Sequence, residues 1–334
     1  MAQRRLSKQE LLTWVDHLIA DYRVIAPVRA AGEETFLQEI AAASEVDLGY
    51  GQTVNSIKEF FFPATETLVH IRRGKRAVHL QVPDLEQPQV VLAVRPCDAA
   101  ALVSMDALFL SDPADTYYGT RRRNTVIVGL ACQEVPTPAC FCTTTGGSPI
   151  GTTNMDVVLY EDGDGYVAEA LTERGQALLA QAGGTVLEQP FVPHEPELPS
   201  YPRSTQEEWL SVFNDDYWER LGERCLGCKI CTYNCPTCYC FDIRDRGTGG
   251  AVERLRTWDA CQSKHFYIEA SGHDPRPTRG MHLRNRFYHK YYYFPWRYAG
   301  TLLCSGCGRC VTQCPVNIDL TEVLEEVAAR AEAG

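Results

Sequence analysis

Apolar runs and polar turns alternate along the first 200 residues in a regular order. Residues 90–94 and 125–130 are almost entirely apolar, as expected of strands buried on both faces of a sheet. A helical stretch, 99–110, lies between them, and residues 157–168 predict a hairpin around an Asp- and Gly-rich turn. This order of elements predicts a mixed α/β domain over residues 1–200.

Two more elements are predicted closer to the amino terminus. Residues 68–71 and 77–82 are expected to form paired strands around the basic turn 72–76. Residues with helical spacing predict an amphipathic helix: Leu11, Trp14, Val15, Leu18 and Tyr22. The pair Arg4-Arg5 also fits a twin-arginine signal, but charged residues interrupt the apolar stretch behind it, and no small-residue cleavage site follows.

A proline-rich segment separates this domain from the rest of the chain. Residues 189–202 contain five prolines and predict a linker. Ser204 and Glu207 have the spacing of a capping box, which predicts one linking helix over 201–224. Residues 225–334 are expected to form a C-terminal, mostly α-helical domain. Its last helix should begin near Asp319 and bury Leu320, Val323, Leu324 and Val327.

A run of cysteines with the spacing C-x2-C-x2-C-x3-C-P occurs twice in this C-terminal domain. The first run is Cys225, Cys228, Cys231 and Cys235, and the second is Cys304, Cys307, Cys310 and Cys314. This is the spacing of bacterial-type [4Fe–4S] ligation, in which the fourth cysteine ligates the other cluster. We therefore predict a ferredoxin-like fold with two [4Fe–4S] clusters. The expected ligand sets are Cys225, Cys228, Cys231 and Cys314 for one cluster, and Cys304, Cys307, Cys310 and Cys235 for the other.

Zinc and disulfides are the alternatives for these cysteines. Zinc sites usually present two separated C-x2-C pairs, whereas each run here has three evenly spaced cysteines and a fourth before proline. Disulfides fit less well, because the chain has an odd number of cysteines, 15, and their clustering suits thiolate ligation in a reducing compartment. Both observations favour iron–sulfur clusters.

Seven cysteines lie outside the two runs. Cys97 and Cys132 follow the two predicted buried strands, whose carboxyl ends should meet at one edge of the sheet, and Cys140 and Cys142 follow in a loop. We expect these four to hold a third [4Fe–4S] cluster, as a hypothesis; buried, inert cysteine is the alternative. Cys238, Cys240 and Cys261 could join a further cluster, but three thiols fall short of a full set, which favours neutral groups in a sulfur-rich interior.

Charge narrows the classes of function. The 334 residues have a net charge of −11, which argues against general nucleic-acid binding. The segment 273–300 differs, with six Arg or Lys, one Asp and eight aromatic residues. Because it lies between the two cysteine runs, it favours packing around anionic clusters over nucleic-acid binding. No stretch approaches the roughly 20 apolar residues of a membrane span, and we expect a cytoplasmic protein.

Several blocks of the chain match a known family. They are 235–243 (CPTCYCFDI), 256–261 (RTWDAC), 270–278 (ASGHDPRPT), 307–310 (CGRC), 314–319 (CPVNID), 56–63 (SIKEFFFP) and 94–101 (VRPCDAAA). With these blocks the chain resembles the beta subunit of cytosolic sulfhydrogenase-type nickel–iron hydrogenases. It is similarly close to the A subunit of anaerobic sulfite reductase.

The resemblance implies an electron-transfer subunit that relays electrons between a flavin- and NAD(P)-binding subunit and a catalytic subunit, of hydrogenase type or, alternatively, of sulfite reductase type. The chain has no G-x-G-x-x-G loop, so flavin and nicotinamide are expected on a partner. Two rival functions remain open at this point. The N-terminal crevice could hold a flavin or substrate and act catalytically, or the clusters could serve only to fold an assembly scaffold.

Overall fold

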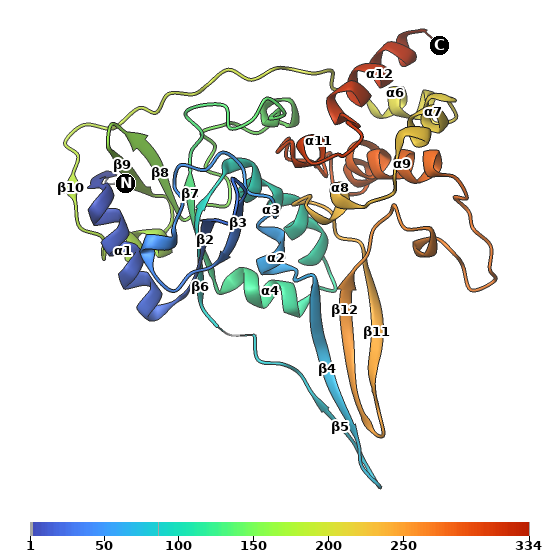
Figure 1. Cartoon of the computed structure of the whole chain (residues 1–334), viewed down its shortest axis with the longest axis horizontal. Coiled ribbons are helices and arrows are strands. Elements are labelled where there is room, and N and C mark those ends of the chain that lie inside the picture. Colours follow the sequence, from blue (N-terminus) through green and yellow to red (C-terminus); the bar gives the residue numbers. More distant parts are fainter. Residues whose placement is uncertain (1–2, 86, 334) are drawn as a thin grey trace.

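A mixed sheet with helices on both faces forms the N-terminal part of the computed structural model, which describes residues 3–85 and 87–333. Within these residues, eight strands follow the order β10 (Thr185–Val186), β1 (Gln3–Ser7), β9 (Gly165–Ala170), β8 (Val157–Asp162), β7 (Thr125–Leu130), β6 (Gln89–Val94), β2 (Arg23–Arg29) and β3 (Thr35–Glu39). The neighbours β2, β6, β7 and β8 run parallel to one another, and the outer pairs are antiparallel. The predicted α/β character of this region is confirmed (Figure 1).

The two central strands are buried along their whole length, as their unbroken apolar sequence predicted. One face packs on α1 (Lys8–Asp21) and α5 (Glu173–Leu179), and α1 buries Leu11, Trp14, Val15 and Leu18 as expected. The other face packs on α2 (Lys58–Phe61), α3 (Pro96–Phe109) and α4 (Thr116–Arg123). Because helices cover both faces of the sheet, loops can bring side chains together at the carboxyl ends of β6 and β7.

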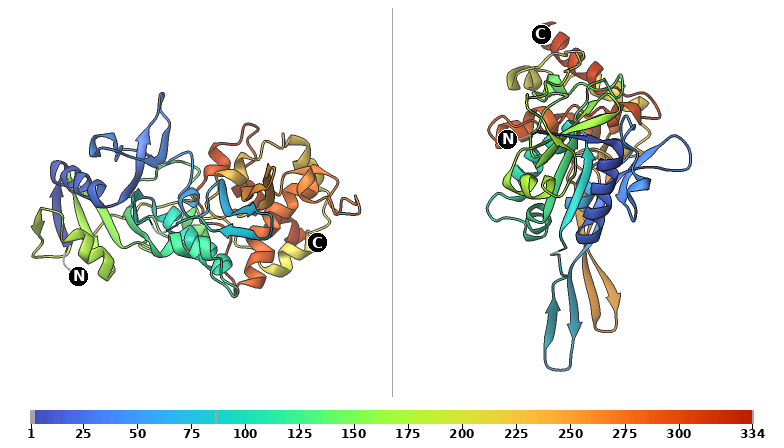
Figure 2. Two further views of the ribbon diagram at one scale, coloured as in Figure 1. Left: turned by 90° about the horizontal axis from the view of Figure 1, so that it is seen from below. Right: turned by 90° about the vertical axis from the view of Figure 1, so that its left-hand side faces the viewer.

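A second, four-stranded antiparallel sheet projects from the body of the molecule, and Figures 1 and 2 show it from three sides. We call it the arm; its order is β11 (Phe241–Thr248), β12 (Ala251–Trp258), β4 (Thr65–Arg73) and β5 (Val78–Gln81). The predicted pairing around the basic turn is confirmed by β4 and β5. The hairpin β11–β12 was not predicted, and it adds sixteen strand residues to a region expected to be mostly α-helical.

Buried ion pairs fix the base of the arm to the N-terminal part. Arg256 of β12 donates to Glu66 of β4 at 2.7 Å and also pairs with Asp115 at the start of α4. Arg121 of α4 donates to the same Glu66 carboxylate at 2.7 Å. Arg256 and Glu66 are both buried. The arm therefore joins strands from both halves of the sequence, and ion pairs hold its base to the N-terminal part.

Short helices make up the remainder of the C-terminal part. They are α6 (Gln206–Ser211), α7 (Tyr217–Arg224), α8 (Ile230–Tyr233), α9 (Arg279–Tyr288), a π-helix (His289–Tyr293), α10 (Phe294–Arg297), α11 (Arg309–Thr312) and α12 (Leu320–Ala333). Single 3₁₀ turns occur at Ala43–Glu45, Cys142–Thr145 and Lys264–Phe266. The last helix buries Leu320, Val323, Leu324 and Val327 as predicted.

Two details of the linking segment differ from the prediction. The capping box is formed by Thr205 and Glu208 instead of Ser204 and Glu207. The expected single helix is two helices, because α6 ends at Ser211 and α7 begins only at Tyr217. The predicted linker, 189–202, contains no helix or strand. No helix within the described ranges combines the length and apolar character that crossing a membrane requires.

Candidate iron–sulfur site

Four cysteines surround one cavity at the carboxyl edge of the large sheet. Cys97 lies in the first turn of α3, directly after β6, and Cys132 comes two residues after β7. Cys140 and Cys142 return in the following loop and line the same cavity. Burial raises the pKa of Cys132 to about 11 and that of Cys142 to about 12. Without a metal the thiols of Cys132 and Cys142 are therefore protonated at neutral pH, so a bound cation would be needed to hold these two as thiolates.

The loop that carries Cys140 and Cys142 packs directly on the second cysteine run. The amide of Phe141 donates to the carbonyl of Gly306 at 3.0 Å. Gly306 has φ +64°, and a Cβ placed there would lie 2.5 Å from Cys142 Cα. A side chain at Gly306 would thus force the loop away from the run. Backbone contact brings these two cysteine groups together.

The second run and the last cysteine of the first run share another cavity. Cys304, Cys307 and Cys310 line it together with Cys235. Burial raises the pKa of Cys307 to about 12. In contrast, a hydrogen bond with Cys238 and the charge of Lys290 hold the pKa of Cys235 below its usual range. The fourth cysteine of one run therefore lies among the first three of the other.

The start of the first run likewise lies near the last cysteine of the second run, Cys314. The pKa of Cys225 is raised chiefly by burial, with smaller effects from the neighbouring Cys228 and Cys314. Backbone amides face these sulfurs, because Gly227 donates to Cys225 at 3.3 Å and Ile318 donates to Cys314 at 3.2 Å. Burial raises the pKa of Cys231 to about 11, and the nearby Cys310 and Cys261 add to this shift. The two runs thus form one continuous group of thiols.

Three buried cations lie beside these thiols. Lys290 is 1% exposed, and its Nζ donates to Cys235 Sγ at 3.2 Å and to the carbonyl of Leu303 at 2.9 Å. Burial alone would lower the pKa of Lys290, but the neighbouring Cys235, Cys238 and Cys304 raise it overall. Arg286 is also buried and donates to the carbonyl of Cys231, and Lys58 stacks over Trp258. The basic segment 273–300 thus brings Arg286 and Lys290 inward, next to sulfur.

Cys238, Cys240 and Cys261 line a cavity of their own. A hydrogen bond between Cys240 and Cys261, together with burial, raises the pKa of Cys261 well above its usual value. Nowhere in residues 3–85 and 87–333 do three His, Cys, Asp or Glu side chains converge tightly enough to hold a single metal ion. The role of these three cysteines as neutral groups stays a prediction.

A buried ion pair that the sequence did not reveal joins the two halves of the site. Arg309, between Cys307 and Cys310, donates to both carboxylate oxygens of Asp98, next to Cys97, at 2.6 and 2.7 Å. Both side chains are at most 2% exposed. Each residue stands beside a cysteine, but nothing in the sequence indicates that they meet, because 210 residues lie between them.

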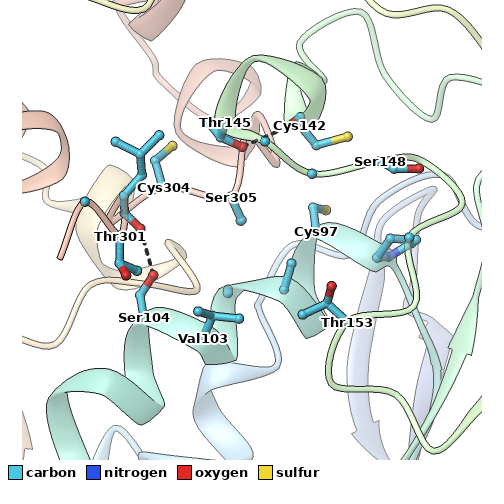
Figure 3. Close-up of a pocket in the computed structure, with 18 of the residues that line it drawn as sticks. Cys97, Val103, Ser104, Cys142, Thr145, Ser148, Thr153, Thr301, Cys304 and Ser305 are labelled. Atoms are coloured by element: carbon cyan, nitrogen blue, oxygen red, sulfur yellow. Dashed lines mark hydrogen bonds between the residues drawn. The ribbon is translucent and has the colours of Figure 1, made fainter. Parts of the chain in front are cut away.

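A larger cavity, which we call the seam cavity, lies between α3, the loop that carries Cys142 and the start of the second cysteine run. Figure 3 shows Cys97 and Cys142 on one part of its wall and Cys304 on another. Ser104 of α3 donates to the carbonyl of Leu302 at 2.8 Å, and this contact bounds one side of the cavity. Serine, threonine and glycine make up much of the rest of the lining.

Comparison with known proteins identifies relatives of this chain. Residues 224–318 match the 4Fe-4S dicluster domain family. Over 318 residues the chain is 31% identical to sulfhydrogenase 2 subunit beta of Pyrococcus furiosus, and the match covers 91% of this chain and 92% of that protein. No solved structure gives a significant match.

Proposed function

The chain belongs to the family of the sulfhydrogenase beta subunit, and from this we propose that it is an iron–sulfur electron-transfer subunit of a multisubunit oxidoreductase. We place it between a flavin- and NAD(P)-binding subunit and a hydrogenase-type catalytic subunit; an anaerobic sulfite reductase-type assembly is the alternative. The observation that carries the proposal is the mutual arrangement of the two cysteine runs, with Cys235 among the thiols of the second run.

The residues fit the donor set of two [4Fe–4S] clusters, which supply one-electron transfer when bound. Cys304, Cys307, Cys310 and Cys235 would hold one cluster, and Cys225, Cys228, Cys231 and Cys314 the other. Backbone amides already donate to two of these sulfurs, and Lys290 donates to a third. Such donors stabilise thiolates, and the buried charge of Lys290 and Arg286 offsets the negative charge of the site.

We also propose a third [4Fe–4S] cluster on Cys97, Cys132, Cys140 and Cys142. Support comes from the common cavity that these four thiols line and from its direct contact with the second run through Gly306. Cys97 and Cys307 are close enough for the charge of one to raise the pKa of the other. Three adjoining clusters would extend the electron path from the C-terminal part into the N-terminal part.

A Cys140→Ala variant tests the third cluster. Anaerobically purified wild-type protein is expected to contain about twelve irons per chain, and the variant about eight, because one four-iron cluster loses a ligand. Cys261→Ala is the matched control, since Cys261 is also buried but lies outside all three proposed ligand sets. Eight irons in the wild type, with no loss on replacing Cys140, would show that these four cysteines hold no cluster.

A redox titration tests the relay function itself. The purified chain, monitored by visible absorbance and electron paramagnetic resonance, is expected to take up about one electron per cluster reversibly. Clusters that stay silent over the accessible range of potential would instead support a purely structural role.

The seam cavity favours one second candidate, a catalytic role in which flavin or substrate binds beside Cys97, Cys142 and Cys304. Flavin released by denaturing the isolated chain would support this candidate. Protein that releases none, but whose clusters accept electrons, would support the relay.

A further inference from the structure

One face of the arm carries most of its apolar side chains. Cross-strand pairing places Leu80 opposite Ile71, and Ile71 opposite Val252, so that these three share a face. Alternation along the strands adds Val78 and Val69, and on β11 it adds Phe241 and Ile243. The same face also carries Arg73 and the ion pair between Arg254 and Asp245. The opposite face is mostly polar, and its residues pair with one another, as Glu253 does with His70 and Arg246.

At the base of the arm the apolar face is part of the protein core. Phe241 packs edge-on against Phe62, whose ring also contacts Phe109 and Trp258. Arg256 on this face extends its guanidinium over Phe62 and Phe241. The N-terminal part therefore covers the first segment of this face.

Farther out, the same face continues without a covering layer. Val78 is 58% exposed and Leu80 67%. Every residue of β5 is exposed, and Figures 1 and 2 show the distal arm extending away from the body. Antiparallel sheets normally pack their apolar face and leave the polar face in water. Apolar side chains that stay exposed together in a single chain are typical of an interaction surface.

Charge indicates what kind of surface covers it. The arm, residues 65–85 and 241–258, has eight Arg and Lys against five Asp and Glu, a net +3 in a chain of −11. Four of these cations, Arg72, Arg73, Lys75 and Arg76, are exposed at the β4–β5 turn. Packing two such arms face to face would bring like charges together, which disfavours a symmetric dimer through this face.

We propose that the distal apolar face of the arm docks on a partner subunit, against an apolar patch with an acidic rim. The inference rests on the proposed function only in requiring that the chain has partner subunits. The apolar face excludes water over the patch, and the basic turn contacts the rim and accelerates association. The edge strand β5 is covered in the same contact, which removes an exposed strand edge.

The test uses the chain co-expressed with the products of the reading frames that flank it, and purified through a tag on this chain. We expect Val78→Asp with Leu80→Asp to weaken binding of one co-purifying subunit at least about tenfold, seen by native mass spectrometry, because two charges enter an apolar contact. The matched control is His79→Asp with Gln81→Asp, on the polar face of the same strand, which should keep the full complex. Iron content and cluster reduction should stay at wild-type levels in both.

Hydrogen exchange on the unmodified protein gives a second measurement. Amides of residues 78–82 are expected to exchange rapidly in the isolated chain and at least about tenfold more slowly in the complex. The proposal is wrong if these amides gain no protection, if the apolar-face variant keeps every subunit, or if the wild-type chain purifies alone. It is equally wrong if the variant only converts a dimer of this chain into monomers. If the proposed electron-transfer function were wrong, the clusters would not accept electrons although the complex stays intact.

Discussion

An Asp98→Asn variant is expected to lose about 3–5 kcal/mol of folding stability, because it leaves the guanidinium of Arg309 buried without its carboxylate. Arg309 has no route to solvent, since it is 1% exposed and its Nε and Nη2 already donate to Thr53, both at 2.8 Å. The loss should appear as a lower midpoint of urea unfolding.

The same variant should also lose iron, because the pair holds α3, with Cys97, against the segment that carries Cys307 and Cys310. Glu326→Gln is the matched control. It breaks a partly exposed i,i+4 pair with Arg330 at 2.9 Å, which is expected to cost only about 0.3–0.5 kcal/mol. Equal unfolding midpoints for the two variants would mean that the buried pair does not join the halves of the site.

The second large effect is expected on the midpoint potential of one of the proposed clusters. Lys290→Met should lower the midpoint potential of the cluster proposed on Cys235, Cys304, Cys307 and Cys310. The substitution removes a buried positive charge and the donor that lies 3.2 Å from Cys235 Sγ. A charge-assisted hydrogen bond contributes about 1.5–3 kcal/mol. For one electron this corresponds to a shift of about 60–130 mV.

Potentiometric titration monitored by electron paramagnetic resonance measures this shift directly. Lys264→Met, at an exposed lysine, is the control for removing one positive charge from the chain. Lys290→Arg keeps the charge and should recover most of the potential. If Lys290→Met and Lys264→Met gave the same potentials, the buried ammonium would have no part in setting them.

Local patterns in the sequence predicted the elements whose burial depends on their own composition. The strands at 90–94 and 125–130 have no polar face to present to water, so only the centre of a sheet accommodates them. The same reasoning placed Cys97 and Cys132 after neighbouring strands, and the structure puts them at one cavity. Their ligation of a cluster stays a prediction.

What the sequence did not reveal depends on contacts between distant residues. Ser204 and Thr205 can both cap a helix, and in the structure Thr205 is the cap. The strands β11 and β12 carry charged residues at many positions, so their partner strand β4, far away in the sequence, decides their conformation. The pair of Arg309 with Asp98 belongs to the same class, because neither residue has a local feature that points to the other.

The pairing of β4 with β12 also sets an order of events during synthesis. About 180 residues separate the end of β4 from the start of β12, and ribosomes add roughly 5–20 residues per second. For roughly 10–40 s, the newly made hairpin β4–β5 has only itself to pair with, and an isolated two-stranded hairpin is marginally stable in water. The arm is therefore among the last parts of the nascent chain to fold, and until then its apolar strands are available to chaperones.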